Sequence, residues 1–276
     1  EHILHRHHGV ESPTFAQVRE YYEKNLHPES IDLEDQEVYE NIFQAGRWAG
    51  IFQFTEPGAQ QFCTRAQPRN IIDVSAITSI YRPGPLSANV HDEYVDAKES
   101  PHHIKYLNDD AHEITQETFG FLIFQEQIAL LAHKLGGLTL DEGNMLRKVL
   151  TKKGTGKDSV KGRLHDKFIS GCIENKIDRG EAQSLWDKFE FFSGYGFNKS
   201  HAVSYSIISF QCAWLWNYYP AEWMAAFLDK EPESRKEKAI NIAKQYGFDI
   251  APLDINKSGK VWEISKDGKT LIQPLT

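Results

Sequence analysis

Residues 191–207, "FFSGYGFNKSHAVSYSI", lead into a stretch in which no Asp, Glu, Lys or Arg occurs from Ser200 to Ala221. A stretch of that length could cross a bilayer. It also contains four serines, a glutamine, an asparagine and a proline, which favour a buried helix in a soluble protein. We therefore predict a long buried helix that carries a lysine, a serine and a histidine at its beginning.

The beginning of this helix is a candidate anion site. Ser200 stands at the predicted N-cap, where the helix dipole favours negative charge. Lys199 and His201 can add charge or hydrogen-bond donors, and Tyr205 follows His201 by four residues, on the same helix face. A capped turn with a core histidine explains the same residues equally well, so both interpretations stay open at this point.

A basic segment precedes it at residues 147–167, with eight Lys or Arg and two Asp. Its charge is +6, so the rest of the chain carries −14, since −8 − 6 = −14. Arg147, Lys148, Lys152 and Lys153 lie within two predicted turns, have no acidic residue one turn away, and precede a Gly-Thr-Gly sequence. Point charges beside exposed backbone N–H groups are suited to phosphate, whereas most charge runs are solvated faces.

Two further segments supply weaker candidates. Arg82 stands before two prolines in "YRPGPLS", which predicts a rigid turn that presents one arginine to a phosphate, a base or a nearby acid. Gln125 and Glu126 open an apolar helical pattern. Glu126 has no partner carboxylate for acid–base catalysis, and Gln and Glu at a helix start more often act as caps.

The remaining pattern predicts a mainly α fold with short β elements near residues 48–54 and 260–275. The aromatic, β-branched stretch at 48–54 predicts a strand or an extended entry, and the tail around Asp267-Gly268 predicts a hairpin or a strand pair. The segment at 70–81 fits a helix or a strand. Helices are predicted at residues 12–25, 34–46, 57–66, 90–100, 119–136, 139–153, 160–176, 178–194, 200–219, 220–228 and 234–247.

Several kinds of chemistry lack support in the sequence. No Asp-x-Asp strand or other set of converging carboxylates appears, so we predict no catalytic and no metal-binding residue in the chain. Asp249 and Asp254 fall in a predicted loop. Cys63, Cys172 and Cys212 are far apart and show no CxxC spacing, which predicts reduced thiols and a cytoplasmic location.

Six blocks of the sequence occur in the order seen in one family. They are "GIFQFTEPG", "YRPGPLS", "YVDAKES", "FGFLIFQEQIALLAHKLGGLTLDEGNMLRKVLTKK", "FSGYGFNKSHAVSYSIISFQCAWLWNYYPAEWMAAFL" and "IAPLDINKS". Together they resemble the bacterial replicative DNA polymerases of the C family, the polymerase III alpha subunits. The resemblance covers about residues 48–260.

The resemblance implies a fingers domain that binds the incoming dNTP and the primer-template in DNA replication. It suggests residues 1–47 as a helical segment following the palm, 48–230 as the fingers core and 231–276 as a distal segment. The nucleotide-binding residues that it implies are Arg82, Arg147, Lys148, Lys152, Lys153, Lys199, Ser200, His201 and, more weakly, Tyr205 and Gln125. The family often has a second arginine where this chain has Lys148, which puts bidentate phosphate contact there in doubt.

The resemblance also sets expectations about what the chain lacks. The family's catalytic aspartates, and the Mg²⁺ that they hold, lie in the palm, upstream of Glu1, so the chain alone is expected to be an inactive part of a nucleotidyltransferase. Its expected partners are primer-template DNA, dNTP, the palm and thumb and, through absent regions, the sliding clamp, with no membrane. The alternative is a standalone, non-catalytic nucleic-acid-binding helical module, a phage or mobile-element relic.

Overall fold

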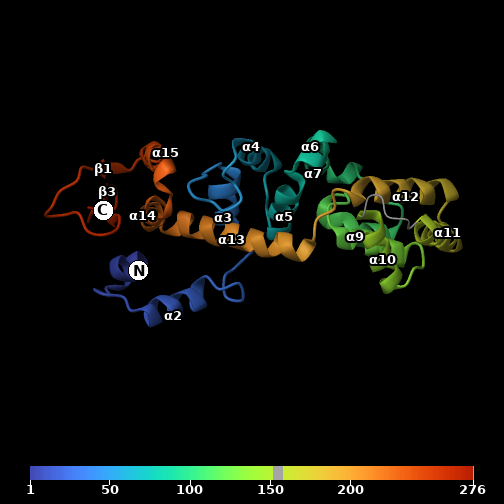
Figure 1. Cartoon of the computed structure of the whole chain (residues 1–276), viewed down its shortest axis with the longest axis horizontal. Coiled ribbons are helices and arrows are strands. Elements are labelled where there is room, and N and C mark those ends of the chain that lie inside the picture. Colours follow the sequence, from blue (N-terminus) through green and yellow to red (C-terminus); the bar gives the residue numbers. More distant parts are fainter. Residues whose placement is uncertain (152–157, 276) are drawn as a thin grey trace. The chain divides into compact units, whose positions relative to one another are not determined.

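The computed structural model describes residues 1–151 and 158–275, and the prediction of a mainly α-helical fold is confirmed (Figure 1). Contacts divide the chain into two compact units. Unit 1 consists of Glu1–Arg69 and Ile207–Thr276, and unit 2 of Asn70–Ser206. The functional division at residues 47 and 230 stays a prediction.

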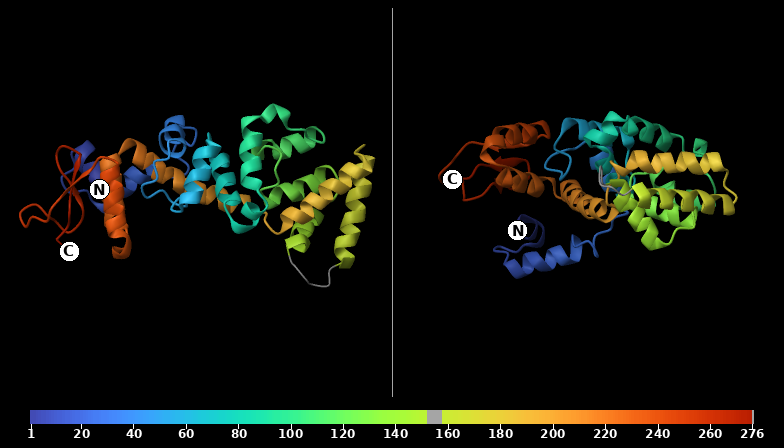
Figure 2. Two further views of the ribbon diagram at one scale, coloured as in Figure 1. Left: turned by 90° about the horizontal axis from the view of Figure 1, so that it is seen from above. Right: turned by 45° about the vertical axis from the view of Figure 1, so that its right-hand side comes forward.

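Unit 1 combines the two ends of the sequence. Its helices α14 and α15 lie beside a small sheet, as Figures 1 and 2 show in orange and red. Its elements are α1 (His2–His8), α2 (Phe15–Asn25), α3 (Gln36–Val38), the π-helix η1 (Tyr39–Gln44), α4 (Pro57–Ala66), the later part of α13 (Lys199–Tyr218), α14 (Pro220–Lys230), α15 (Glu233–Gln245), β1 (Asp249–Ala251), β2 (Glu263–Ile264) and β3 (Thr270–Ile272).

The predicted long helix is confirmed as α13, but it is only partly buried, because Tyr205, Ile208 and Tyr218 are exposed. In unit 1 its inner face is aromatic. Phe210 and Trp216 are fully buried, and Phe210 packs on Tyr39 of η1 with 5.1 Å between ring centroids. The Arg47 guanidinium lies 4.5 Å above the Trp216 ring, a cation–π contact. No helix in the described part of the chain is long and apolar enough to cross a membrane.

The strand predicted at residues 48–54 is wrong. Gly50 and Gln53 both have left-handed backbone angles, φ 70° and 69°, which interrupt an extended strand. The main chain here is satisfied by side chains instead: Ala49 O accepts from Trp223 Nε1 at 2.7 Å, and Phe52 O accepts from Ser209 Oγ at 2.8 Å. The segment is an irregular loop in which Phe54 is buried and stacks on Trp48 with 5.1 Å between ring centroids, whereas Phe52 is exposed.

The predicted strand pair in the tail is confirmed. β2 and β3 are antiparallel, with Glu263 opposite Ile272, and Gly268 in the turn has φ 71°. The segment that contains Asp249, expected to be a loop, forms β1 and pairs in parallel with β3. That pairing joins residues about twenty positions apart, so local sequence patterns give no sign of it.

Unit 2 contains the helices that hold most of the candidate residues, shown in green and yellow in Figure 1. The segment at 70–81, which fitted a helix or a strand, is a helix. The elements are α5 (Ile71–Ile80), α6 (Pro83–Ser87), α7 (Val90–Glu99), η2 (Pro101–His103), α8 (Asp109–Thr115), η3 (Gln116–Thr118), α9 (Gln125–Lys134), α10 (Leu140–Thr151), α11 (Asp158–Glu174), α12 (Arg179–Ser193) and the first residues of α13.

The core of unit 2 lies among α9, α10, α11 and α12, around the buried rings of Phe168, Trp186 and Phe189. Gly171 of α11 lies directly against the backbone of Gly136, which follows α9, because a Cβ at Gly171 would be 2.0 Å from Gly136 O. Thr139 and Glu142 cap α10: Thr139 Oγ1 accepts from the Glu142 N–H, and the Glu142 carboxylate accepts from the Thr139 N–H.

Two predicted helix starts and one predicted turn differ in the structure. The helix predicted at 12–25 begins at Phe15, and Thr14 with Gln17 forms the capping box at its start. The helix predicted from residue 119 begins at Gln125, because Phe119 and Gly120 have positive φ of 54° and 82°. The predicted rigid turn at 82–87 is a short helix, α6, that begins with Pro83 at N1.

Candidate functional site

The start of α13 is capped by Asn198, and the prediction of Ser200 as the N-cap is wrong. Asn198 Oδ1 accepts from the His201 N–H at 2.9 Å and from Ser200 Oγ at 2.7 Å. Asparagine is as good a cap as serine, and because Asn198 stands two positions before Ser200, the helix begins at Lys199. Ser200 is therefore an exposed residue of the first turn.

Glu126 links the start of α13 to two other helices. From the first turn of α9, its carboxylate accepts from Asn198 Nδ2 at 2.7 Å and from the Lys199 N–H at 3.0 Å. Arg147 Nη1 of α10 lies 3.7 Å from the same carboxylate. An internal anion thus occupies the helix N-terminus that was predicted to attract one.

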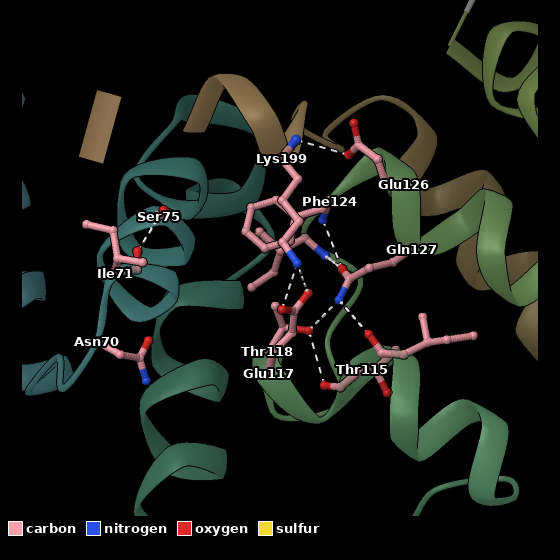
Figure 3. A network of polar contacts seen from close by, with 12 residues as sticks. Asn70, Ile71, Ser75, Thr115, Glu117, Thr118, Phe124, Glu126, Gln127 and Lys199 are labelled. Carbon is pink, nitrogen blue, oxygen red and sulfur yellow. Dashed lines mark hydrogen bonds and ion pairs between the residues drawn. The ribbon is translucent and has the colours of Figure 1, made fainter. Parts of the chain in front are cut away.

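The Lys199 side chain points to a second carboxylate. Its ammonium donates to both Glu117 oxygens at 2.7 Å and lies 5.7 Å from the Phe124 ring centroid (Figure 3). The side chains of Lys199 and Glu117 are 34% and 30% exposed, so solvent reaches the pair. The first-turn cation of α13 is therefore already paired.

A buried network fixes the segment that carries Glu117. Gln127 Oε1 accepts from the N–H groups of Ile123 and Phe124 at 3.0 Å, and its Nε2 donates to Thr118 Oγ1 at 2.7 Å (Figure 3). Gln127 is 2% exposed, and both the oxygen and the nitrogen of its side-chain amide are hydrogen-bonded. Because buried amides are costly to leave unpaired, this network holds η3 against the start of α9.

Gln125 and Phe197 join α9 to the loop before α13. The Gln125 N–H donates to Phe197 O at 2.9 Å, and the Phe197 N–H donates to Ile123 O at 3.0 Å, a short parallel bridge. Gln125 Nε2 also donates to Gly196 O at 3.0 Å. The predicted nucleotide residue Gln125 is thus committed to the loop backbone.

Arg82 reaches the same loop from the end of α5. Its guanidinium lies 4.8 Å above the Phe197 ring. The turn that follows fits closely, because a Cβ on Gly84 would lie 2.1 Å from Cδ1 of Tyr195. The "RPGP" and "GYGFN" motifs begin 112 positions apart in the chain, since 194 − 82 = 112, and they contact each other in the fold.

The aromatic side chains continue along α13. The His201 ring lies 5.4 Å from the Phe197 centroid and 4.1 Å from that of Tyr205. His201 and Tyr205 are both exposed, so His201 is not a core histidine. Arg82, Phe197, His201 and Tyr205 form a row in which each side chain contacts the next, through one cation–π contact, one edge-to-face contact and one tilted ring contact.

In the basic segment, several side chains form ion pairs that the sequence does not suggest. Arg147 faces Glu126 at 3.7 Å, and Lys148 is exposed on the next position of α10. Acidic partners come from other helices: Lys161 pairs with Glu190 at 2.8 Å and Lys167 with Glu142 at 2.7 Å. Lys152 and Lys153 lie outside the described residues.

The arrangement can bind an anion next to an aromatic surface. Arg82, Arg147 and Lys199 all connect to the loop at 194–198 and the start of α13. The described residues hold no group of three His, Cys, Asp or Glu side chains that could bind a metal ion. The cations and the neighbouring aromatic rings are therefore suited to recognise a phosphate and a planar group.

Four residues of this site were missed or underrated: Glu117, Glu126, Phe197 and Asn198. Glu126 was visible as a carboxylate without a partner, and Asn198 as a cap residue two positions before Ser200. Glu117 gave no signal, because its partner is 82 positions away.

Comparisons with known proteins agree on one family. A model described as the bacterial DNA polymerase III alpha subunit finger domain matches residues 12–176. The protein named DNA polymerase III subunit alpha from Campylobacter jejuni is 34% identical over 92% of this chain, and that from Aquifex aeolicus is 34% identical over 87%. The chain spans about a fifth of the length of these relatives, 21% and 20% respectively.

Proposed function

The chain belongs to the bacterial DNA polymerase III alpha subunit family, as its finger domain, and we propose that the loop at 194–198 and the start of α13 bind the triphosphate of an incoming dNTP. Lys199, Arg147 and Arg82 are the cations, and Ser200 and Lys148 are exposed polar groups beside them. Lys152 and Lys153 are included in the proposal on the basis of the sequence alone.

The observation that carries the proposal is the meeting of three separate motifs. Arg82 of "RPGP", Arg147 of "LRK" and Lys199 of "NKSH" all contact the same loop or its carboxylate, Glu126. A triphosphate carries several negative charges, and charge-assisted hydrogen bonds to Arg and Lys contribute about 1.5–3 kcal/mol each. Basic residues that three separate segments bring to one loop are expected of such a site.

The row of aromatic side chains supports a second part of the proposal, contact with a base. Stacking on aromatic and guanidinium planes contributes about 1–3 kcal/mol per base in single-stranded nucleic acid. We propose that His201 and Tyr205 contact the nucleobase or the template, and that Gln125 acts indirectly, through Gly196. In template-directed synthesis this domain supplies positive charge and orientation, and the catalytic carboxylates and Mg²⁺ come from outside the described residues.

Titration of the chain with dATP, and then with a primer-template, at 50 mM and 200 mM salt tests the proposal. Binding is expected to weaken at the higher salt concentration, as phosphate contacts do. Lys199→Glu and Arg147→Glu should each abolish dATP binding. A chain that binds DNA but does not bind dATP would favour the alternative, a nucleic-acid-binding module. Charge-reversed variants that bind dATP as tightly as the parent would refute the assignment of the site.

A further inference from the structure

The two carboxylates at the start of α13 differ in how they are held. Glu126 accepts from Asn198 Nδ2 and the Lys199 N–H and also faces Arg147. Among the described residues, the Glu117 carboxylate has a single partner, the Lys199 ammonium, at 2.7 Å to both oxygens. Glu126 is thus part of the framework, whereas Glu117 serves one movable cation.

We propose that Glu117 is an internal substitute for the phosphate, which holds Lys199 in place until a triphosphate exchanges with it. The proposal rests on the function proposed above. A carboxylate that binds an ammonium through two oxygens imitates two oxygens of a phosphoryl group, in charge and in geometry. Exchange is feasible because the pair is about one-third exposed, so water can solvate the released Glu117.

The backbone around Glu117 makes this a positioned contact. Glu117 lies between Gln116 and Thr118 in η3, and Thr118 Oγ1 is tied to Gln127 at 2.7 Å (Figure 3). The backbone that carries Glu117 is therefore held in place, while Lys199 has a long flexible side chain. When the Lys199 ammonium binds a phosphate, Glu117 stays close to it and competes with the phosphate for that ammonium.

The competition has a measurable cost. Partly exposed ion pairs typically contribute about 0.2–1 kcal/mol, and two-oxygen contacts lie at the upper end or above it. Removing the Glu117 charge should therefore strengthen binding of inorganic tripolyphosphate and of dATP by about three- to tenfold. Glu126→Gln should have the opposite effect and weaken binding, because Glu126 holds Arg147 and the first turn of α13.

The test is a binding titration of the chain with tripolyphosphate and with dATP. It compares the parent, Glu117→Gln and Glu113→Gln, the last an exposed carboxylate on α8 that controls for net charge. We expect three- to tenfold tighter binding by Glu117→Gln and less than a twofold change in Glu113→Gln. Equal affinities of Glu117→Gln and the parent, or weaker binding, would overturn the inference.

A double variant separates this inference from the function on which it rests. In a Lys199→Gln background, Glu117→Gln should give no further gain, because its effect passes through the lysine. A gain of the same size in that background would show a general charge effect and overturn the inference alone. A parent chain that binds neither ligand would instead overturn the proposed function, and with it the inference.

Discussion

Gly171 and Gly162 lie in the same helix, α11, and the structure predicts opposite results when each is changed to alanine. An ideal Cβ on Gly171 would lie 2.0 Å from Gly136 O and 2.5 Å from its carbonyl carbon, whereas a Cβ on Gly162 would meet nothing within 4 Å. The atoms near Gly171 belong to the backbone, so they cannot rotate away. Helix α11 would have to move by about 1 Å or more.

The size of the effect follows from the neighbours of Gly171. Phe168, Ile169 and Cys172 of α11 are all buried in the core of unit 2, so a shift of the helix loosens their packing. Overpacking of a core costs about 1–3 kcal/mol, and occasionally more, against a gain of about 1 kcal/mol from replacing glycine in a helix. We expect Gly171→Ala to lower the free energy of unfolding by about 2 kcal/mol and Gly162→Ala to raise it by about 0.5–1 kcal/mol.

Urea unfolding followed by far-UV circular dichroism measures the free energy of unfolding of each variant. Hydrogen exchange of peptides from α11 and α12 shows whether the change in stability lies in unit 2. Faster exchange in these peptides is expected for Gly171→Ala and slower or equal exchange for Gly162→Ala. If Gly171→Ala proves as stable as Gly162→Ala, the close approach of α11 to Gly136 is not a feature of the folded protein.

Three further predictions concern the cap of α13, a buried acid and a buried thiol. Asn198→Ala should cost about 1 kcal/mol of stability and weaken dATP binding in calorimetry, and Asn198→Asp should not restore binding, because its carboxylate would face Glu126. Burial acts to raise the pKa of Glu222, but hydrogen bonds from its own backbone, His7 and Arg6 together hold that pKa below its usual value. Its contribution to stability is present above about pH 4.5 and lost as the pH falls further, so Glu222→Gln should flatten the acid limb of the unfolding profile. Burial raises the pKa of the Cys172 thiol to about 11, so at pH 8 only about one molecule in a thousand carries the thiolate and iodoacetamide should label this residue only after unfolding.

Periodicity and caps in the sequence predicted most of the helices, because these depend on residues three or four positions apart. Thr139 with Glu142 and Pro220 at N1 of α14 are examples where local chemistry decides the boundary. The failures also have local causes. Residues 48–54 have the composition of a strand, but two left-handed positions and side-chain partners for the main chain make them a loop.

The candidate site was predictable in its cations but not in its anions. Arg82, Arg147 and Lys199 stand in short motifs that show their chemistry in the sequence. Glu117 and Glu126 gain their roles from residues 82 and 73 positions away, through pairings that exist only in the fold. The sequence therefore suggested an unpaired basic cluster, whereas in the described residues Arg147 of that cluster faces Glu126 and Lys199 is paired with Glu117.

The proposed role of Lys199 is tested most directly by the dissociation constant of dATP for the parent chain and for Lys199→Gln, with Lys188→Gln on the exposed face of α12 as the control for charge. Loss of one charge-assisted contact predicts about tenfold or greater weakening for Lys199→Gln, and no change beyond about twofold for Lys188→Gln. Equal weakening in both variants would reveal a general charge effect, and unchanged binding by Lys199→Gln would contradict the proposal that the start of α13 holds the triphosphate.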